Sequence, residues 1–256
     1  MKHQRYPAIV RTLFASVLLL AAAVLPAQTP DFEALIRQLD DSSTFENMDF
    51  SAIFTIVTDR PNKKQEVSQI RMFRRDSKDQ SLILILLPEA DKGQGYLMEG
   101  DNLLFYDPTS RKFSHTSMKE ALSDSEAQND DFSKNDTLED YSIASTSEAM
   151  LGKFPVWVID LKARRNDVSY DQVRLYVRKD MPLVLKQEYL SVSGRLMRTM
   201  LYPKYAEVTK GKYFPSQMLI VDEINKGEKS QITLSEISVD KLPDKVFTKA
   251  FLEQAN

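Results

Sequence analysis

The chain has no cysteine, only two histidines, His3 and His115, and a single tryptophan, Trp157, among 256 residues. Disulfide bonds and thiol chemistry are therefore excluded. Ordinary zinc sites are built from cysteine and histidine ligands, so the same shortage excludes them as well. The fold must be held together by its core, and we expect neither a metal ion nor another cofactor.

The shortage of histidine also argues against nucleophilic catalysis. A Ser-His-Asp arrangement would have to use His115, in the stretch FSHTS, and no Gly-x-Ser-x-Gly motif accompanies it. We interpret His115 as an exposed or partly buried residue at the end of a strand. A hydrolase that uses His115 is kept as the weaker hypothesis, and we predict that the chain is not an enzyme.

Glycine is scarce too, and three of the seven glycines fall together in the stretch GQGYLMEGDNLLFYDPTSRKF, residues 93–113. The spacing of Gly93, Gly95 and Gly100 differs from the Gly-x-Gly-x-x-Gly pattern of a nucleotide-binding loop, and no strand-then-helix pattern surrounds it. Gly93 and Gly95 are better explained by crowding within strands. Gly100 opens a Gly-Asp-Asn hairpin turn that needs a positive φ.

The N-terminus is typical of an export signal. Basic residues near the start precede an apolar run from Leu13 to Leu25, and a small residue, Ala27, follows. We predict a signal peptide over 1–27, cleaved after Ala27, and one domain over 28–256; retention of this segment as an anchor is the alternative. Its removal takes three basic residues, so the net charge of −3 becomes −6. Without a cysteine to carry a lipid, the mature chain is expected to be soluble in the periplasm.

Most of the remaining sequence has the pattern of β-strands. Residues that are β-branched or aromatic alternate with polar ones, and the segments are joined by short turns such as KDMP and KGEK. Short links predict an antiparallel meander that curves strongly or partly closes into a barrel. The expected strands, about eleven in all, are 48–59, 67–75, 81–88, two within 93–113, 153–162, 170–178, 182–192, 195–208, 213–223 and 231–239.

Three other segments differ from this pattern. Residues 30–41 and 242–254 have the apolar spacing of amphipathic helices. The segment 114–147 is polar and acidic, with a sparse apolar face, and predicts a lid or a long excursion. It lacks the spacing of a calcium-binding loop, so we interpret its acids as solvated. Acidic and basic residues are interspersed along the chain, which argues against a nucleic-acid partner.

The stretch 74–113 resembles the outer-membrane lipoprotein-sorting protein family, the LolA-like periplasmic carriers. The resemblance also includes the ending LPDKVFTKAFLE, residues 242–253, whereas the acidic run SMKEALSDSEAQNDDFSKND departs from the family and matches it only at Asp131-Phe132. The positions that carry the resemblance are Arg75, Ser77, Lys78, Asp79, Pro88, Asp91, Lys92, Gly93, Gly95, Gly100, Asp101, Asn102, Tyr106, Pro108, Arg111 and Lys112.

The resemblance implies an incomplete, half-open antiparallel β-barrel with a few covering helices around an apolar cavity. It further implies a soluble, monomeric carrier that shields the acyl chains of lipids or lipidated proteins and delivers them toward the outer membrane. Its partners would be an inner-membrane ABC transporter and an outer-membrane acceptor. The alternative is a non-enzymatic envelope scaffold or adhesin with the same fold and a filled core.

Strand alternation predicts which residues face the interior, although a shift of one residue would invert a strand. Arg74 and Arg75 are candidates for contact with a lipid head group, but we favour a solvated surface position for both. The predicted cavity residues are Phe54, Ile56, Ile70, Met72, Leu84, Leu86, Leu97, Leu103, Phe105, Val158, Leu175, Val177, Leu185, Met197, Met200, Met218 and Ile220.

Overall fold

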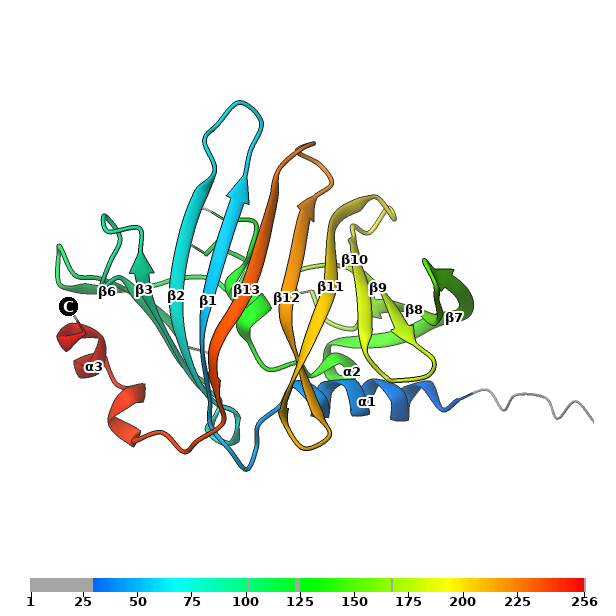
Figure 1. Ribbon diagram of the computed structural model, residues 1–256, viewed down its shortest axis with the longest axis horizontal. Helices are drawn as coiled ribbons and strands as arrows, with labels where there is room; N and C mark the ends of the chain where they lie inside the picture. The colour runs from blue at the N-terminus through cyan, green and yellow to red at the C-terminus, as the bar shows by residue number, and fades with distance from the viewer. Residues whose placement is uncertain (1–29, 101, 123–124, 167, 256) are drawn as a thin grey trace, which may run out of the picture. The chain divides into compact units, whose positions relative to one another are not determined.

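A single antiparallel sheet of thirteen strands dominates the computed structural model, which describes residues 30–100, 102–122, 125–166 and 168–255 (Figure 1). The chain divides after Pro30, and the residues from Asp31 onward form one compact unit. The predicted signal peptide lies outside the described residues. The strands are β1 (Phe50–Asp59), β2 (Glu66–Arg75), β3 (Gln80–Leu87), β4 (Gly95–Glu99), β5 (Asn102–Asp107), β6 (Lys112–His115), β7 (Tyr141–Leu151), β8 (Phe154–Ala163), β9 (Gln172–Arg178), β10 (Val184–Leu190), β11 (Leu196–Thr209), β12 (Lys212–Asp222) and β13 (Lys229–Ser238).

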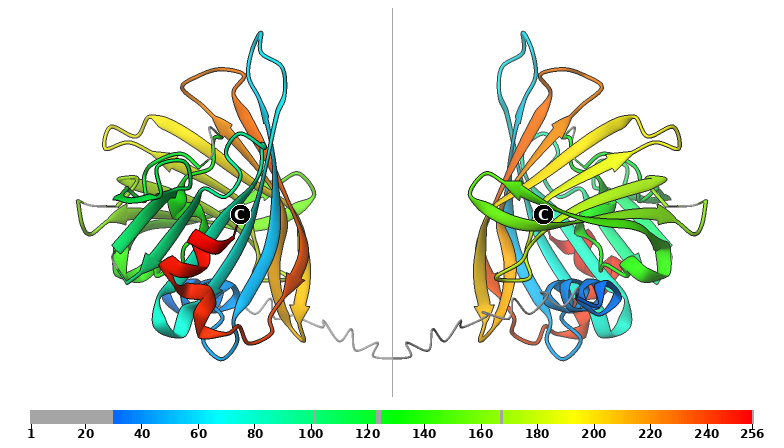
Figure 2. Two further views of the ribbon diagram at one scale, coloured as in Figure 1. Left: turned by 90° about the vertical axis from the view of Figure 1, so that its left-hand side faces the viewer. Right: turned by 90° about the vertical axis from the view of Figure 1, so that its right-hand side faces the viewer.

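Two meanders make up the sheet. Strands β1 to β6 follow one another outward, β7 to β13 follow one another inward, and β1 pairs with β13 in the middle. Phe54, for example, lies opposite Leu234 across that seam. The sheet curves strongly and its two edge strands, β6 and β7, are not paired with each other (Figure 2). The predicted mainly β, half-open barrel is therefore confirmed.

The edge strands β6 and β7 are the two that the sequence pattern did not predict. β6 has only four residues, and β7 is exposed without interruption over residues 144–150. Neither strand shows the alternation of apolar and polar residues that a half-buried strand shows. The sheet consequently has two more strands than the eleven expected.

Helix α1 (Phe32–Ser43) lies against the inner face of the sheet, which we define as the face that carries α1 and the β6–β7 connection. The Asp31 carboxylate accepts a hydrogen bond from the Ala34 amide, 3.1 Å away, and caps the helix. Ile36 and Leu39 are buried against residues of β8 and β9, among them Leu161 and Leu175. The predicted N-terminal helix is confirmed, and it closes one end of the inner face.

The C-terminal segment packs on the other, outer face of β3 to β5. The single helix expected there is instead a 3₁₀ turn, Asp244–Phe247, followed by the short helix α3 (Lys249–Gln254), which Thr248 caps. Leu252 is buried in a cluster with Leu82, Leu84 and Leu97. These strands therefore have an apolar core on both faces.

The connection from β6 to β7, which we call the covering segment, crosses the inner face. It comprises residues 116–140 except the undescribed pair 123 and 124, and includes the short helix α2 (Thr137–Asp140). Leu122, Ala127 and Phe132 are buried in one cluster with strand residues such as Phe54. The acidic segment is thus an excursion, as predicted, but its few apolar residues form part of the core.

The two hairpins within residues 93–113 form part of the barrel wall. A side chain at Gly95 would meet the Ile83 carbonyl oxygen at 2.5 Å and Leu252 at 2.6 Å, so this position needs glycine. Gly100 opens the first turn with φ of 57°, and Arg111 ends the second with φ of 53°.

The other positions of the resemblance have structural places as well. Gly93 also has a positive φ, Asn102 begins β5, and Pro108 lies in the second turn. Tyr106 packs on Phe113, with ring centres 4.7 Å apart. Asp101 lies outside the described residues. No helix among the described residues is long and apolar enough to cross a membrane.

Candidate functional site

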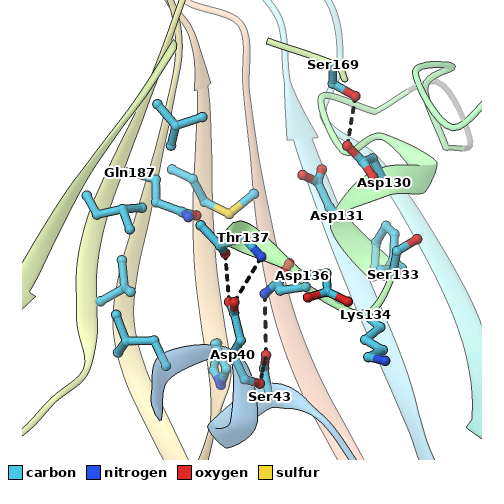
Figure 3. Close-up of a pocket in the computed structure, with 18 of the residues that line it drawn as sticks. Asp40, Ser43, Asp130, Asp131, Ser133, Lys134, Asp136, Thr137, Ser169 and Gln187 are labelled. Carbon is cyan, nitrogen blue, oxygen red and sulfur yellow. Dashed lines mark hydrogen bonds between the residues drawn. The ribbon is translucent and has the colours of Figure 1, made fainter. Parts of the chain in front are cut away.

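A cavity of about 430 Å³ lies on the inner face of the sheet, mainly over β8 to β12, and reaches β1 and β2 at Phe54 and Met72. It is bordered by α1 at one end and by the covering segment, and its volume falls within the range of small-molecule sites. Figure 3 shows side chains from these elements converging on the space. Its apolar lining comes from Ile36, Leu39, Phe54, Met72, Met118, Phe132, Leu161, Val168, Val173, Leu175, Leu183, Val184, Met200, Phe214, Pro215 and Met218.

Most of the predicted interior residues lie on the inner face, but only some reach the cavity. Five of them line it: Phe54, Met72, Leu175, Met200 and Met218. Six others belong to the clusters that pack beside it: Ile56, Ile70, Leu103, Phe105, Val177 and Ile220. Whether any of them contacts a lipid stays a prediction.

The remaining six predicted residues belong neither to the cavity lining nor to the two clusters beside it. Leu84, Leu86 and Leu97 belong to the outer-face cluster beneath α3. Because β3 is apolar on both faces, alternation within SLILILL cannot choose between them. The inward residues of β3 are Ile83 and Ile85.

Register explains the remaining three. Met197 lies at a register shift between β11 and β10 and is not in the lining, whereas Met200, three residues later on the same strand, lines the cavity. Val158 alternates with the inward Ile159 and lies on the outer face. Leu185 lies at a register shift between β10 and β9, where Val184 faces the cavity instead.

One wall of the cavity is formed by tyrosines that the sequence analysis did not identify. The Tyr189 hydroxyl donates to Gln187 Oε1 at 3.1 Å, the Tyr202 hydroxyl donates to the same oxygen, and the Tyr205 hydroxyl donates to the Val184 carbonyl at 2.6 Å. Burial raises the pKa of all three tyrosines, so they stay protonated. The two-residue spacing of Gln187 and Tyr189 was the available signal, but strand pairing was needed to bring them to Tyr202.

A buried ion pair attaches the covering segment to the sheet. Arg198 of β11 donates to Asp131 with both terminal nitrogens, Nη1 to Oδ1 at 2.8 Å, and the side chains are only 7% and 8% exposed. Arg198 also donates to the Glu126 carbonyl at 3.0 Å. Burial alone would lower the pKa of Arg198, but the carboxylate of Asp131 raises it above its usual value. Arg198 is therefore a charged anchor for residues 126–131.

The mouth of the cavity carries carboxylates that neutral groups hold in place (Figure 3). Asp40 of α1 accepts hydrogen bonds from the Thr137 amide at 2.9 Å and the Thr137 hydroxyl at 2.7 Å. Asp130 accepts one from the Ser169 hydroxyl at 2.8 Å. Burial raises the pKa of both carboxyl groups. The mouth is consequently a poor site for a second negative charge.

Arg74 and Arg75 are buried, so the expected solvated positions are wrong for both. Arg74 lines the cavity, pairs with Asp76 at 2.7 Å and donates to the Ser43 carbonyl at the end of α1. Arg75 points to the outer face and binds Asp49 with two nitrogens, at 3.2 and 3.0 Å. Both arginines join structural elements.

One group of carboxylates among the described residues is close enough together to share a cation. Three carboxylates, Glu126, Asp222 and Glu228, have oxygens within 4.8 Å of one another. Arg60 lies 3.7 Å from Glu126 and 3.8 Å from Glu228 and balances part of that charge. His115 is exposed on β6 and is not part of the cavity lining.

The comparisons with known proteins agree with this architecture. A protein-family model that carries the description "Uncharacterized protein" matches residues 77–254, more than half of the chain. No curated protein matches the chain.

Three solved structures match 86% of this chain each. A LolA superfamily protein from Nitrosomonas europaea is 24% identical, with 98% of its own chain covered and a TM-score of 0.74. A putative outer membrane lipoprotein-sorting protein domain from Vibrio parahaemolyticus is 15% identical, with 97% covered and a TM-score of 0.75. A DUF1329 family protein from Desulfovibrio piger is 20% identical, with 96% covered and a TM-score of 0.75. The chain therefore belongs to the family that the matching model describes, and its fold is that of the LolA superfamily.

Proposed function

We propose that this protein is a non-enzymatic periplasmic carrier that holds the acyl chains of lipids or lipidated proteins in the inner-face cavity. The observation that carries the proposal is the cavity itself, enclosed between a curved sheet, α1 and the covering segment. Methionine is prominent in its wall, at Met72, Met200 and Met218. Flexible, polarisable side chains suit a surface that accepts acyl chains of varying shape.

The energetics of acyl chains require such an enclosure. Each methylene group exposed to water costs about 0.8 kcal/mol, so a soluble carrier must shield most of the chain. Release requires that the carrier hold the chain less favourably than the acceptor does. The covering segment suits that requirement, because polar contacts such as those of Arg198 and Asp40 hold it near the cavity.

Delivery toward the outer membrane, with an inner-membrane ABC transporter as donor and an outer-membrane acceptor, is part of the same proposal. It is supported by the family resemblance of residues 74–113, by the LolA superfamily fold and by the export signal of the sequence. The scaffold or adhesin alternative required a filled core. A cavity of about 430 Å³ favours the carrier.

The experiment is purification of the full chain from the periplasm of a Gram-negative host, followed by mass spectrometry of extracted lipid. We expect bound acyl lipid in the wild type and its loss in Met200→Trp, which fills the cavity. Met197→Trp is the matched control, because Met197 lies on the same strand and does not line the cavity. A wild type that is reproducibly empty, and that also fails to accept a triacylated lipoprotein, would contradict the proposal.

A further inference from the structure

Gln187 is a polar residue in an otherwise apolar row across the sheet. On β10 it lies directly opposite Leu175 of β9 and Met200 of β11, both of which line the cavity. The row continues with Ile159 beyond Leu175 and with Ile220 beyond Met200. A polar side chain costs free energy at such a position unless its groups are hydrogen-bonded. The role of Gln187 therefore depends on what its amide contacts.

Two tyrosines orient that amide. Oε1 of Gln187 accepts hydrogen bonds from the hydroxyls of Tyr189 and Tyr202, which use both lone pairs of the oxygen. No residue in the described part of the chain accepts a hydrogen bond from Nε2 of Gln187. Figure 3 shows the side chain reaching from its strand into the cavity. The two N–H groups of Nε2 are thus directed at whatever the cavity holds.

The charges around the cavity select the partner for those donors. Three of the four basic side chains in the described lining are already paired with an aspartate: Arg74 with Asp76, Arg165 with Asp140 and Arg198 with Asp131. The fourth is Lys134, and the lining also contains three further aspartates, Asp40, Asp130 and Asp136. An anionic head such as a phosphate would meet excess negative charge. A neutral acceptor oxygen would not.

We propose that Gln187 is a specificity-determining residue that recognises the ester or amide carbonyl at the head end of an acyl chain. The chain itself would lie along Leu175, Met200 and Met218, and the carbonyl oxygen would accept from Nε2 of Gln187. Tyr189 and Tyr202 are positioning residues that keep Nε2 facing the ligand. This inference rests on the proposed carrier function, and it adds a chemical class of ligand and an orientation for it.

The test compares two ligands that differ only in the carbonyl groups: didecanoylglycerol and the corresponding didecyl glycerol ether. One hydrogen bond to a neutral group is worth about 0.5–1.5 kcal/mol, so we expect the wild type to bind the ester roughly two- to tenfold more tightly. Binding is measured by titration calorimetry on delipidated protein. Didecanoyl phosphatidate is expected to bind more weakly than didecanoylglycerol, and tighter binding would contradict the charge argument.

Variants at position 187 isolate the donor. Gln187→Met removes the whole amide, and Gln187→Glu keeps an acceptor for the two tyrosines while removing the N–H donors. Both should lose the ester preference, whereas Gln217→Glu, on the outer face of β12, should keep it. Equal binding of both ligands by the wild type would overturn the inference and leave the carrier function standing. Binding of neither ligand would overturn both.

Discussion

The inner face of the sheet has two halves that the chain uses differently. Over β1 to β5 it is filled, because Leu122, Ala127 and Phe132 of the covering segment are buried among residues such as Ile56 and Ile70. Over β8 to β12 it borders the cavity, which reaches the first half only at Phe54 of β1 and at Met72 and Arg74 of β2. Figure 2 shows both halves as parts of one curved sheet. The filled half is a core, and the open half is a container.

Side-chain chemistry accounts for the difference. In the filled half, apolar residues pack without a gap, and at its border with the cavity Phe54 meets Phe132 edge to face, with ring centres 5.2 Å apart. In the open half, the hydroxyls of Tyr189, Tyr202 and Tyr205 bond to groups of their own wall. Because these three hydroxyls find acceptors within the wall, they need no partner from the covering segment. A fold that is filled on one side can therefore keep a stable space on the other.

The largest effect is expected at the ion pair that anchors the covering segment beside the open half. Asp131→Ala leaves Arg198 buried without its carboxylate and should lower the free energy of unfolding by about 3–5 kcal/mol. Asp130→Ala is the matched control, since the Asp130 carboxylate accepts an exposed hydrogen bond from the Ser169 hydroxyl and forms no ion pair with a described residue, and it should cost less than about 1 kcal/mol. Urea denaturation measures both. Equal losses would show that Arg198 and Asp131 do not anchor the segment.

The second-largest effect is expected from truncating an apolar side chain, and its cost in stability should differ between the two halves. Ile56→Ala opens a void in the filled half and should cost about 3 kcal/mol. Met218→Ala enlarges a space that already exists, so about 1–2 kcal/mol is expected. The two losses are compared by the midpoints of urea denaturation, provided that the dependence of the unfolding free energy on urea concentration is unchanged. A greater cost for Met218→Ala would mean that the open half is packed as tightly as the filled half.

Enlarging a side chain should also cost more stability in the filled half than in the open half. Ala52→Leu overpacks the filled half and should cost about 2 kcal/mol. Leu175→Phe projects into the cavity, so we expect less than about 1 kcal/mol of destabilisation together with weaker binding of didecanoylglycerol. Stability and binding are measured on the same preparations. Full binding by the Leu175→Phe protein would place the ligand elsewhere.

The smallest effect concerns Asp40 at the cavity mouth, whose pKa burial raises above the ordinary value of 3.8. Between 3.8 and its raised value the folded state binds more protons than the unfolded state, so this group lowers the free energy of unfolding as pH rises through that window. Asp40→Asn should remove this slope and raise stability at neutral pH by about 0.5 kcal/mol or less. Urea denaturation across the acid range tests it, and a steeper fall in the variant would contradict the assignment.

The sequence predicted elements that have a strong pattern of their own. Eleven strands and α1 were recognisable because each buries apolar residues in a regular pattern. The turn at Gly100 was recognisable because it needs a residue with a positive φ. The edge strands β6 and β7 were missed because they bury little. The prediction of which β3 residues point inward was wrong, because both faces of that strand are apolar.

The candidate site was predicted less well, because it depends on which strands become neighbours. Met200 and Met218 were found by alternation, and Met197 was misplaced by the same method. Gln187 and Tyr202 lie on different strands, and only the register of β10 with β11 brings them together. The burial of Arg74 depended on partners such as Asp76 and the end of α1. Such contacts are set by tertiary structure.

The most direct test of the two-halves account is nuclear magnetic resonance of carbon-labelled methionine methyl groups during titration with didecanoylglycerol. Met200 and Met218 report on the open half, Met98 packs beside the filled half, and Met197 lies on β11 outside the cavity lining. We expect shift changes and contacts to ligand protons at Met200 and Met218, with Met98 and Met197 unchanged. Ligand contacts at Met98 or Met197, with Met200 and Met218 unaffected, would contradict the account.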